Sequence, residues 1–418
     1  MRGADVLLTR LKVAFKNAPV PNIPGMVKEE MELFRADVRD GMSVAVTVGS
    51  RGIFNIAGIV KAVVEALASY GAKPFIIPAM GSHGGATAEG QKAVLAEYGV
   101  TEEAMGVPVL SSMDVVKLGT LPGDEGLPLY MDKLAAGADA VFVVNRVKAH
   151  TDFHGDNESG IAKMLSIGLG KHAQALVAHG YLSDGLRSFV PRMADTIQSM
   201  GKVLGALAIV EDGYDQTSIL RAVKPRDIVR VDAELLKISK AMTPALPFQS
   251  AHVLLVDWLG KNISGTGMDP NIIGRAGIRG EPDSPPHTEV ICLFDLTPES
   301  HGNALGVGLA DLVPRRLTDK VDWKVTYENV RTSRFLCRGA TPVTLPTDRE
   351  VVDMGLFACG HVGKETLRLA RIRNTLRVDE IYVTDALLNE AKATGRVEVM
   401  ESGVPLVFSE DGTLQKLP

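Results

Sequence analysis

Residues 43–85 read SVAVTVGSRGIFNIAGIVKAVVEALASYGAKPFIIPAMGSHGG, and this stretch decides the fold class. Two β-branched, apolar runs at 43–48 and 73–80 flank a segment at about 56–70 whose apolar residues recur with helical spacing. Each run ends in a glycine-rich turn. A repeated order of strand, glycine-rich turn and helix is typical of a parallel α/β sheet, whose ligands bind beyond the carboxyl ends of the strands.

Further apolar runs extend this pattern along the chain. Strands are expected at 140–144 and 203–210, and both turns described above should therefore meet these strand ends at one edge. Residues 1–40 are expected to add an edge strand and a short helix. Pro244 and Pro247 indicate a boundary before a second set of helices and strands. In this second set we expect strands at 251–257, 290–295 and 380–385, and a helix at 364–374.

The length of 418 residues favours two domains, each able to bury its own core. We predict an α/β protein with mainly parallel sheets, an N-terminal domain at 1–245, a C-terminal domain at 250–418, and an active-site cleft between them. The second domain should close over the site. A loop at 265–275 motivates this expectation.

Composition narrows the class of partner and the compartment. Hydrophobic residues make up 45% of the chain and the net charge is −5, which argues against a nucleic-acid or membrane partner and favours a small molecule. Cys292, Cys337 and Cys359 show no C-x-x-C spacing, which fits a reducing compartment. No signal peptide and no apolar run of about 18 residues is apparent, so we expect a soluble cytoplasmic protein.

Residues 145–179 read NRVKAHTDFHGDNESGIAKMLSIGLGKHAQALVAH and hold four of the nine histidines. His172 and His179 are spaced to share one helix face, where they are either metal ligands or part of a solvated surface. Lys163 lies in an apolar run, which suits a covalent role, although a lysine at a helix start is the alternative. Among these histidines, His150 follows the strand at 140–144 most closely, and His154 has a looser local argument.

The strand-end turns supply the other candidates. Arg51 precedes a helix and is expected to bind a carboxylate or phosphate, unless it forms an ordinary surface ion pair. His83 stands between glycines and is either an acid–base group or a capping residue. In the second domain, Asn271 and Arg275 are polar tips of a loop, and His361 is either a helix cap or a cleft residue.

Taken together, these residues resemble the nickel-pincer-dependent lactate racemase family. In that family an arginine follows the first strand, a histidine sits in a G-x-H loop, and a third segment reads roughly H…G-G-x-K…P-G…H. The matching residues here, in order, are Arg51, His83, His150, Lys163 and His179. The interval from the lysine to the last histidine also matches the family.

The resemblance implies a cofactor and a set of roles. Lys163 would carry a nickel pyridinium-3,5-dithiocarboxylic acid mononucleotide through a thioamide bond, and His179 would be the only protein ligand to nickel. His83 and His150 would be the acid–base pair. Ser50, Arg51, Gly81 and Gly168 would lie beside the cofactor, and Arg51, Asn271 and Arg275 beside the substrate. Enzymes that make the cofactor would be partners.

Departures from the family pattern point to a different substrate. Val48 replaces the family's aspartate, and residues 152–159 form an insertion, so His154 competes with His150 as the second acid–base group. The family's tyrosine, glutamine and substrate-binding lysine are replaced by Ile273, Gly274 and Gly277; Arg275 or Arg279 would supply the lost charge.

The sequence therefore predicts a racemase or epimerase that inverts C2 of a 2-hydroxy acid other than lactate. Two alternatives remain open. The first is a cofactor-free protein that binds an anionic small molecule. The second is a hydrolase or lyase that uses His83 and a divalent metal.

Overall fold

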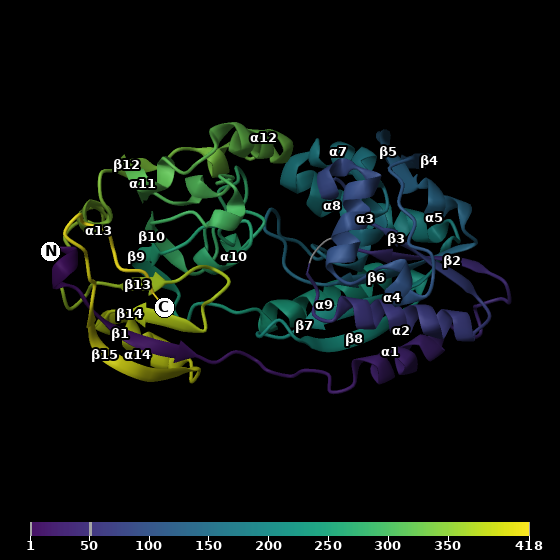
Figure 1. The fold of residues 1–418 in the computed structure, drawn as a ribbon, viewed down its shortest axis with the longest axis horizontal. Coiled ribbons are helices and arrows are strands. Elements are labelled where there is room, and N and C mark those ends of the chain that lie inside the picture. Colours follow the sequence, from purple (N-terminus) through teal and green to yellow (C-terminus); the bar gives the residue numbers. More distant parts are fainter. Residues whose placement is uncertain (1, 50–51, 418) are drawn as a thin grey trace. The chain divides into compact units, whose positions relative to one another are not determined.

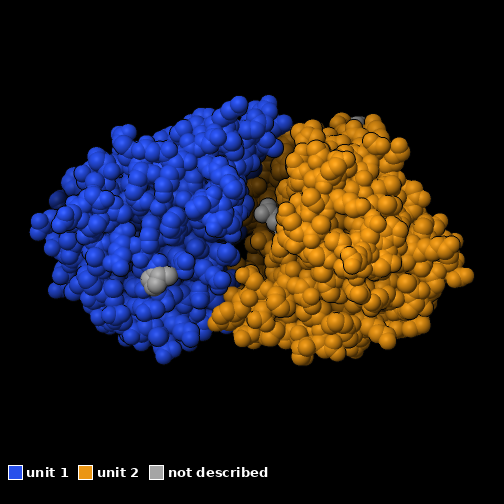
Figure 2. All heavy atoms as spheres, in the orientation of Figure 1, with its two compact units in different colours: residues 1–15, 244–418 blue, residues 16–243 orange. Residues whose placement is uncertain are grey.

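A computed structural model describes residues 2–49 and 52–417 of the chain (Figure 1). The chain divides into two units, coloured separately in Figure 2. Unit 2 contains residues 16–243, and unit 1 combines residues 1–15 with residues 244–418. Each unit has its own sheet and its own hydrophobic core.

The sheet of unit 2 is built around β2 (Ser43–Val48). This strand pairs in parallel with β3 (Lys73–Pro78) on one side and with β6 (Ala140–Arg146) on the other. β7 (Val203–Glu211) continues the parallel order beside β6, and β8 (Thr217–Val223) adds an antiparallel strand. In the described residues the strand order is β3-β2-β6-β7-β8, which confirms the predicted parallel α/β arrangement.

Helices cover both faces of this sheet (Figure 1). Val141 and Val143 of β6 face one core, whereas Phe142 and Val144 face the other, so the strand is apolar throughout. The helices of unit 2 are α1 (Ile23–Met31), α2 (Ile56–Ser69), α3 (Ala88–Glu97), α4 (Glu102–Met105), α5 (Lys133–Gly137), α6 (Ile161–Lys163), α7 (Lys171–His179), α8 (Leu182–Ser199) and α9 (Ile228–Met242).

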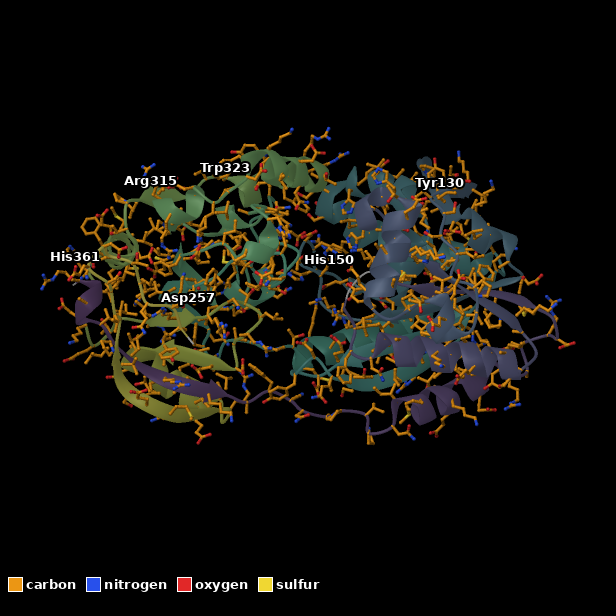
Figure 3. All side chains as sticks on the ribbon, viewed as in Figure 1. Tyr130, His150, Asp257, Arg315, Trp323 and His361 are labelled. Atoms are coloured by element: carbon orange, nitrogen blue, oxygen red, sulfur yellow. The ribbon has the colours of Figure 1, made fainter. Side chains whose placement is uncertain are left out.

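A hairpin of β4 (Val115–Leu121) and β5 (Asp124–Asp132) also belongs to unit 2 and was not predicted. It supports α7, because the Tyr130 amide donates to Gln174 Oε1 at 2.8 Å. Figure 3 labels Tyr130 on this hairpin.

Unit 1 holds a larger sheet, ordered β12-β11-β10-β9-β13-β14-β1-β15 in the described part of the chain. The strands from β12 to β13 are parallel, and the remaining pairs are antiparallel. The parallel strands are β9 (Ser250–Val256), β10 (His287–Leu293), β11 (Leu312–Pro314), β12 (Val343–Leu345) and β13 (Leu369–Ile372). The helices are α10 (Pro270–Ile273), α11 (Arg315–Thr318), α12 (Trp323–Ser333), α13 (Asp348–Ala358) and α14 (Asp385–Ala393).

The first strand departs from the expected organisation. β1 (Leu7–Val13) lies between β14 (Glu380–Val383) and β15 (Val397–Pro405), and it is antiparallel to both. Residues 1–15 therefore belong with the C-terminal unit, and β1 is not an edge strand. Its partners lie more than 300 residues away in the chain, where no local pattern points to them.

The helix predicted at 364–374 is wrong, because β13 occupies this position. Leu369, Ala370 and Ile372 are buried between β9 and β14, and Leu369 is in register with Val253. Arg371 is buried in the same strand and pairs with Asp257 at 2.9 Å, so charged residues interrupt the apolar pattern that would have indicated a strand. In the described residues, no helix has the length and apolar character needed to cross a bilayer.

Candidate active site

The loop that follows β6 is organised by a buried carboxylate. The amide of His150 donates to Glu158 Oε2 at 2.7 Å, and the amide of Gly155 donates to Oε1 at 3.1 Å. Lys148 and Ser159 exchange backbone hydrogen bonds and close the base of the loop. Figure 3 labels His150 on this loop. The loop is therefore an ordered structure that orients His150.

Glu158 remains ionised despite its burial. Burial alone raises the pKa of Glu158, but hydrogen bonds from His154, Lys240 and two backbone amides outweigh it, so the pKa lies below its ordinary value. The carboxylate side chain has 0% exposure. His154 Nδ1 faces this carboxylate at 3.4 Å, so His154 helps to hold the loop.

Lys163 contacts His150 directly. Lys163 ends α6, and its Nζ lies within hydrogen-bonding distance of His150 Nε2. The imidazole stacks at 4.7 Å, centroid to centroid, on the buried ring of Phe153, and Lys163 Nζ lies 5.7 Å from the centre of that ring. The loop and α6 thus bring together an amine and an imidazole that are thirteen residues apart in the sequence.

Asp232 fixes the start of α6. Its carboxylate accepts hydrogen bonds from the amide of Ile161 at 2.6 Å and from Asn157 Nδ2 at 3.0 Å. A Cβ on Gly160 would lie 2.0 Å from Asp232 Oδ1, so only glycine allows this approach. Complete burial raises the pKa of Asp232 to about 6, although these hydrogen bonds lower it.

The histidine loop after β3 is joined to the segment that follows Lys163. The amide of Gly81 donates to the carbonyl oxygen of Gly168 at 3.4 Å. Gly81 has a φ of +58°, a conformation that favours glycine, and a Cβ on Gly168 would lie 2.9 Å from the carbonyl oxygen of Ala79. His83 follows and is exposed. Gly81 and Gly168 therefore allow these two segments to pack closely, and their contact with a cofactor stays a prediction.

A series of hydrogen bonds between buried polar side chains supports the same loop. Gln91 Nε2 donates to the carbonyl oxygens of Gly81 at 2.9 Å and His83 at 3.2 Å. Lys171 Nζ donates to Gln91 Oε1 at 3.0 Å and to the carbonyl oxygen of Pro78. Lys171 also forms an ion pair with Asp132 at 3.1 Å, and both side chains are 0% exposed. Burial lowers the pKa of Lys171, and Asp132 opposes that effect.

Helix α7 carries the two histidines proposed as metal ligands. His179 is its last residue, and both His172 and His179 are partly buried. His172 Nδ1 is buried and has no hydrogen-bond partner among the described residues. Within residues 2–49 and 52–417, three or more histidine, cysteine, aspartate or glutamate side chains do not gather into a metal-binding group.

In unit 1, Asn271 and Arg275 have different hydrogen-bond partners. The amide and Nδ2 of Asn271 donate to Asp269 Oδ1 at 2.9 and 3.0 Å, while the amide of Asp269 donates to Thr375 just beyond β13. Arg275 instead pairs with Asp311 at 2.7 Å and donates to carbonyl oxygens at the amino end of β10. Its charge is thus balanced within unit 1, and its assignment to substrate rests on sequence alone.

Three other candidates have different outcomes. His361 is exposed after α13, and because β13 rather than a helix is the next element after it, the expected capping role is wrong (Figure 3). Ser50 and Arg51 lie outside the described residues, so their roles stay predictions.

Asp232, Lys171 and Gln91 were not predicted from the sequence. A signal for Asp232 exists, because it interrupts the apolar face that α9 forms from Ile228, Val231, Leu235 and Leu236. A carboxylate on a buried face needs hydrogen-bond donors, and here they come from the start of α6. Lys171 stands between Gly170 and His172, where no regular apolar face surrounds it, and gives no comparable signal.

No protein-family model matches the chain, and no curated protein does. Two solved structures resemble it at low identity. A structural-genomics protein from Thermotoga maritima has a TM-score of 0.49 and 13% identity, covering 81% of this chain and 84% of that one. The lactate racemase apoprotein from Thermoanaerobacterium thermosaccharolyticum has a TM-score of 0.47 and 14% identity, covering 85% and 82%. Neither likeness is strong enough to support a statement about activity.

Proposed function

We propose that this protein is a racemase or epimerase that inverts C2 of a 2-hydroxy acid, using a nickel-pincer nucleotide held on Lys163. The contact between Lys163 Nζ and His150 Nε2 carries the proposal. It joins the residue that would form the tether to a residue that would exchange protons with the substrate. The link from Gly81 to Gly168 supports it, because it connects the His83 loop to the same segment.

The residues present fit the cofactor. Such a group brings a carbon and two sulfur donors, so it requires one imidazole from the protein rather than a cluster of ligands. Helix α7 offers His179 for this position. His172, whose buried Nδ1 has no hydrogen-bond partner in the described part of the chain, is the alternative ligand. Lys163 supplies the amine for the covalent link.

The histidines act on the hydroxyl group of the substrate. The C2 hydrogen of a 2-hydroxy acid is too weakly acidic for direct removal by an imidazole, so inversion proceeds through hydride transfer. The cofactor, when bound, would supply the hydride-transfer chemistry that this inversion needs. His83 and His150 would exchange the hydroxyl proton on opposite faces of the planar 2-keto acid, and His150 would take up a proton only once the Asp152 amide releases Nδ1. Arg51 is proposed to hold the carboxylate.

The intact mass of protein co-expressed with cofactor-making enzymes tests this proposal. We expect an adduct together with nickel, its loss in Lys163→Ala, and its retention in Lys237→Ala, which changes an exposed lysine on α9. Chiral chromatography of 2-hydroxy acids should then show racemisation only by the adduct-bearing forms. An unmodified Lys163 under these conditions overturns the mechanism. Nickel bound to unmodified protein would instead favour a metal-dependent hydrolase or lyase.

A further inference from the structure

The hydrogen bonds around His150 define its tautomer. The backbone amide of Asp152 donates to His150 Nδ1 at 3.0 Å, so Nδ1 must present its lone pair. A neutral imidazole carries only one ring hydrogen. That hydrogen therefore sits on Nε2, the atom that faces Lys163 Nζ.

The hydrogen on Nε2 determines the protonation state of Lys163. An ammonium group has three donors and no acceptor, so it cannot accept a hydrogen bond from Nε2–H. A neutral amine has a lone pair and can. We propose that His150 holds Lys163 as a neutral, nucleophilic amine before any ligand binds, ready to react with an activated acyl or thioacyl carbon. The biological meaning of this state rests on the proposed function, in which Lys163 forms the covalent tether.

Of the other groups near His150 and Lys163, some favour a positive charge on the lysine and others disfavour it. The carboxylate of Asp152, whose Oδ2 lies 4.0 Å from His150 Nδ1, and the ring of Phe153 favour positive charge nearby. The charge of Glu158 is already offset by Lys240 and by bonds from the loop. Buried apolar residues adjoin Lys163 in the chain, Ala162 and Met164, and they disfavour an ammonium ion. The direct Nε2–H contact is the closest of these influences.

The reaction that reports this state is acetylation by acetic anhydride. The lone pair of Nζ forms a bond to one carbonyl carbon, the bond from that carbon to the bridging oxygen breaks, and acetate leaves with the electron pair. The extra proton on nitrogen passes to water. Only the neutral amine can take the first step, so the rate follows the neutral fraction.

Competitive labelling of the cofactor-free protein with isotopically labelled acetic anhydride, read by peptide mass spectrometry, provides the test. An ordinary lysine, with a pKa of about 10.4, should label roughly 300-fold more slowly at pH 7 than at pH 9.5. We expect Lys163 to slow by less than about tenfold, with Lys237 as the reference in the same sample. Comparing each lysine with itself removes differences in accessibility. A fall of roughly 300-fold at Lys163 would overturn the inference.

Two variants separate the role of His150 from general disruption of the loop. In His150→Gln the amide can turn its oxygen toward an ammonium, so we expect the labelling of Lys163 at pH 7, relative to pH 9.5, to fall at least about tenfold. His154→Gln, which changes the histidine that faces Glu158, should leave it unchanged. Equal behaviour of the two variants would contradict the assignment. If the labelling shows that Lys163 is a neutral amine but the protein never carries a cofactor there, the inference stands while the proposed function fails.

Discussion

The amide nitrogen of His150 lies 2.7 Å from Oε2 of Glu158, a carboxylate with no exposed surface. This bond ties the orientation of a proposed catalytic residue to a charge that is buried eight residues later in the chain. The loop after β6 is therefore organised by its own acidic residue. That relationship leads directly to a measurable pH dependence.

Glu158→Gln should destabilise unit 2 by about 1–3 kcal/mol at pH 7, because the amide cannot accept all the hydrogen bonds of the carboxylate. The pKa of Glu158 is lower in the folded protein, so its contribution is present above the unfolded value and is lost as the pH falls below about 4.5. Urea unfolding at pH 7, 5 and 3.5 should show the difference shrinking. Asp156→Asn, an exposed change in the same loop, should stay within about 0.5 kcal/mol of the wild type.

Asp232 should give the opposite pH dependence. Burial raises its pKa to about 6, so its contribution is full below the unfolded value near 3.9 and is lost as the pH rises through 6. A shift of two units corresponds to about 3 kcal/mol. We expect Asp232→Asn to flatten the decline in the free energy of unfolding between pH 4 and 7.5. An unchanged slope would show that the buried carboxyl does not titrate in this range.

Lys171→Met should lower the free energy of unfolding by about 3–5 kcal/mol, because it leaves Asp132 as a buried charge without its cation. Adding Asp132→Asn removes that charge and keeps the acceptor that caps α5, so the double variant should recover part of the loss. Urea unfolding of the two forms decides this. A double variant no more stable than Lys171→Met would show that the bonds from Lys171 to Pro78 and Gln91 dominate.

Gly160→Ala should destabilise the start of α6. The new methyl group would sit 2.0 Å from Asp232 Oδ1 and would displace the bond to the Ile161 amide, at an expected cost of about 2–4 kcal/mol. Gly137→Ala is the matched control, since no described atom outside its own helix and chain neighbours lies within 4 Å of the place its methyl group would take. Thermal unfolding of both variants should separate them. Equal stability would indicate that Asp232 moves aside without loss.

The sequence by itself determined the parallel sheet of unit 2. Residues 43–48 and 140–144 are buried on both faces, so their composition carries the signal without help from distant residues. The same rule placed His83 and His150 after their strands. The element predicted at 364–374 was wrong, because arginines interrupt the apolar residues of β13 and Arg371 is buried only through its ion pair with the distant Asp257.

The tertiary structure alone decided which of these side chains meet. The sequence favours His150 over His154 without excluding His154, and the structure separates them: His150 contacts Lys163, whereas His154 faces the Glu158 carboxylate. The supports of the site, Asp232 and Lys171, come from distant segments. Their roles depend on burial, which makes an unpaired charge costly and forces donors and acceptors together. Local periodicity does not encode that pairing.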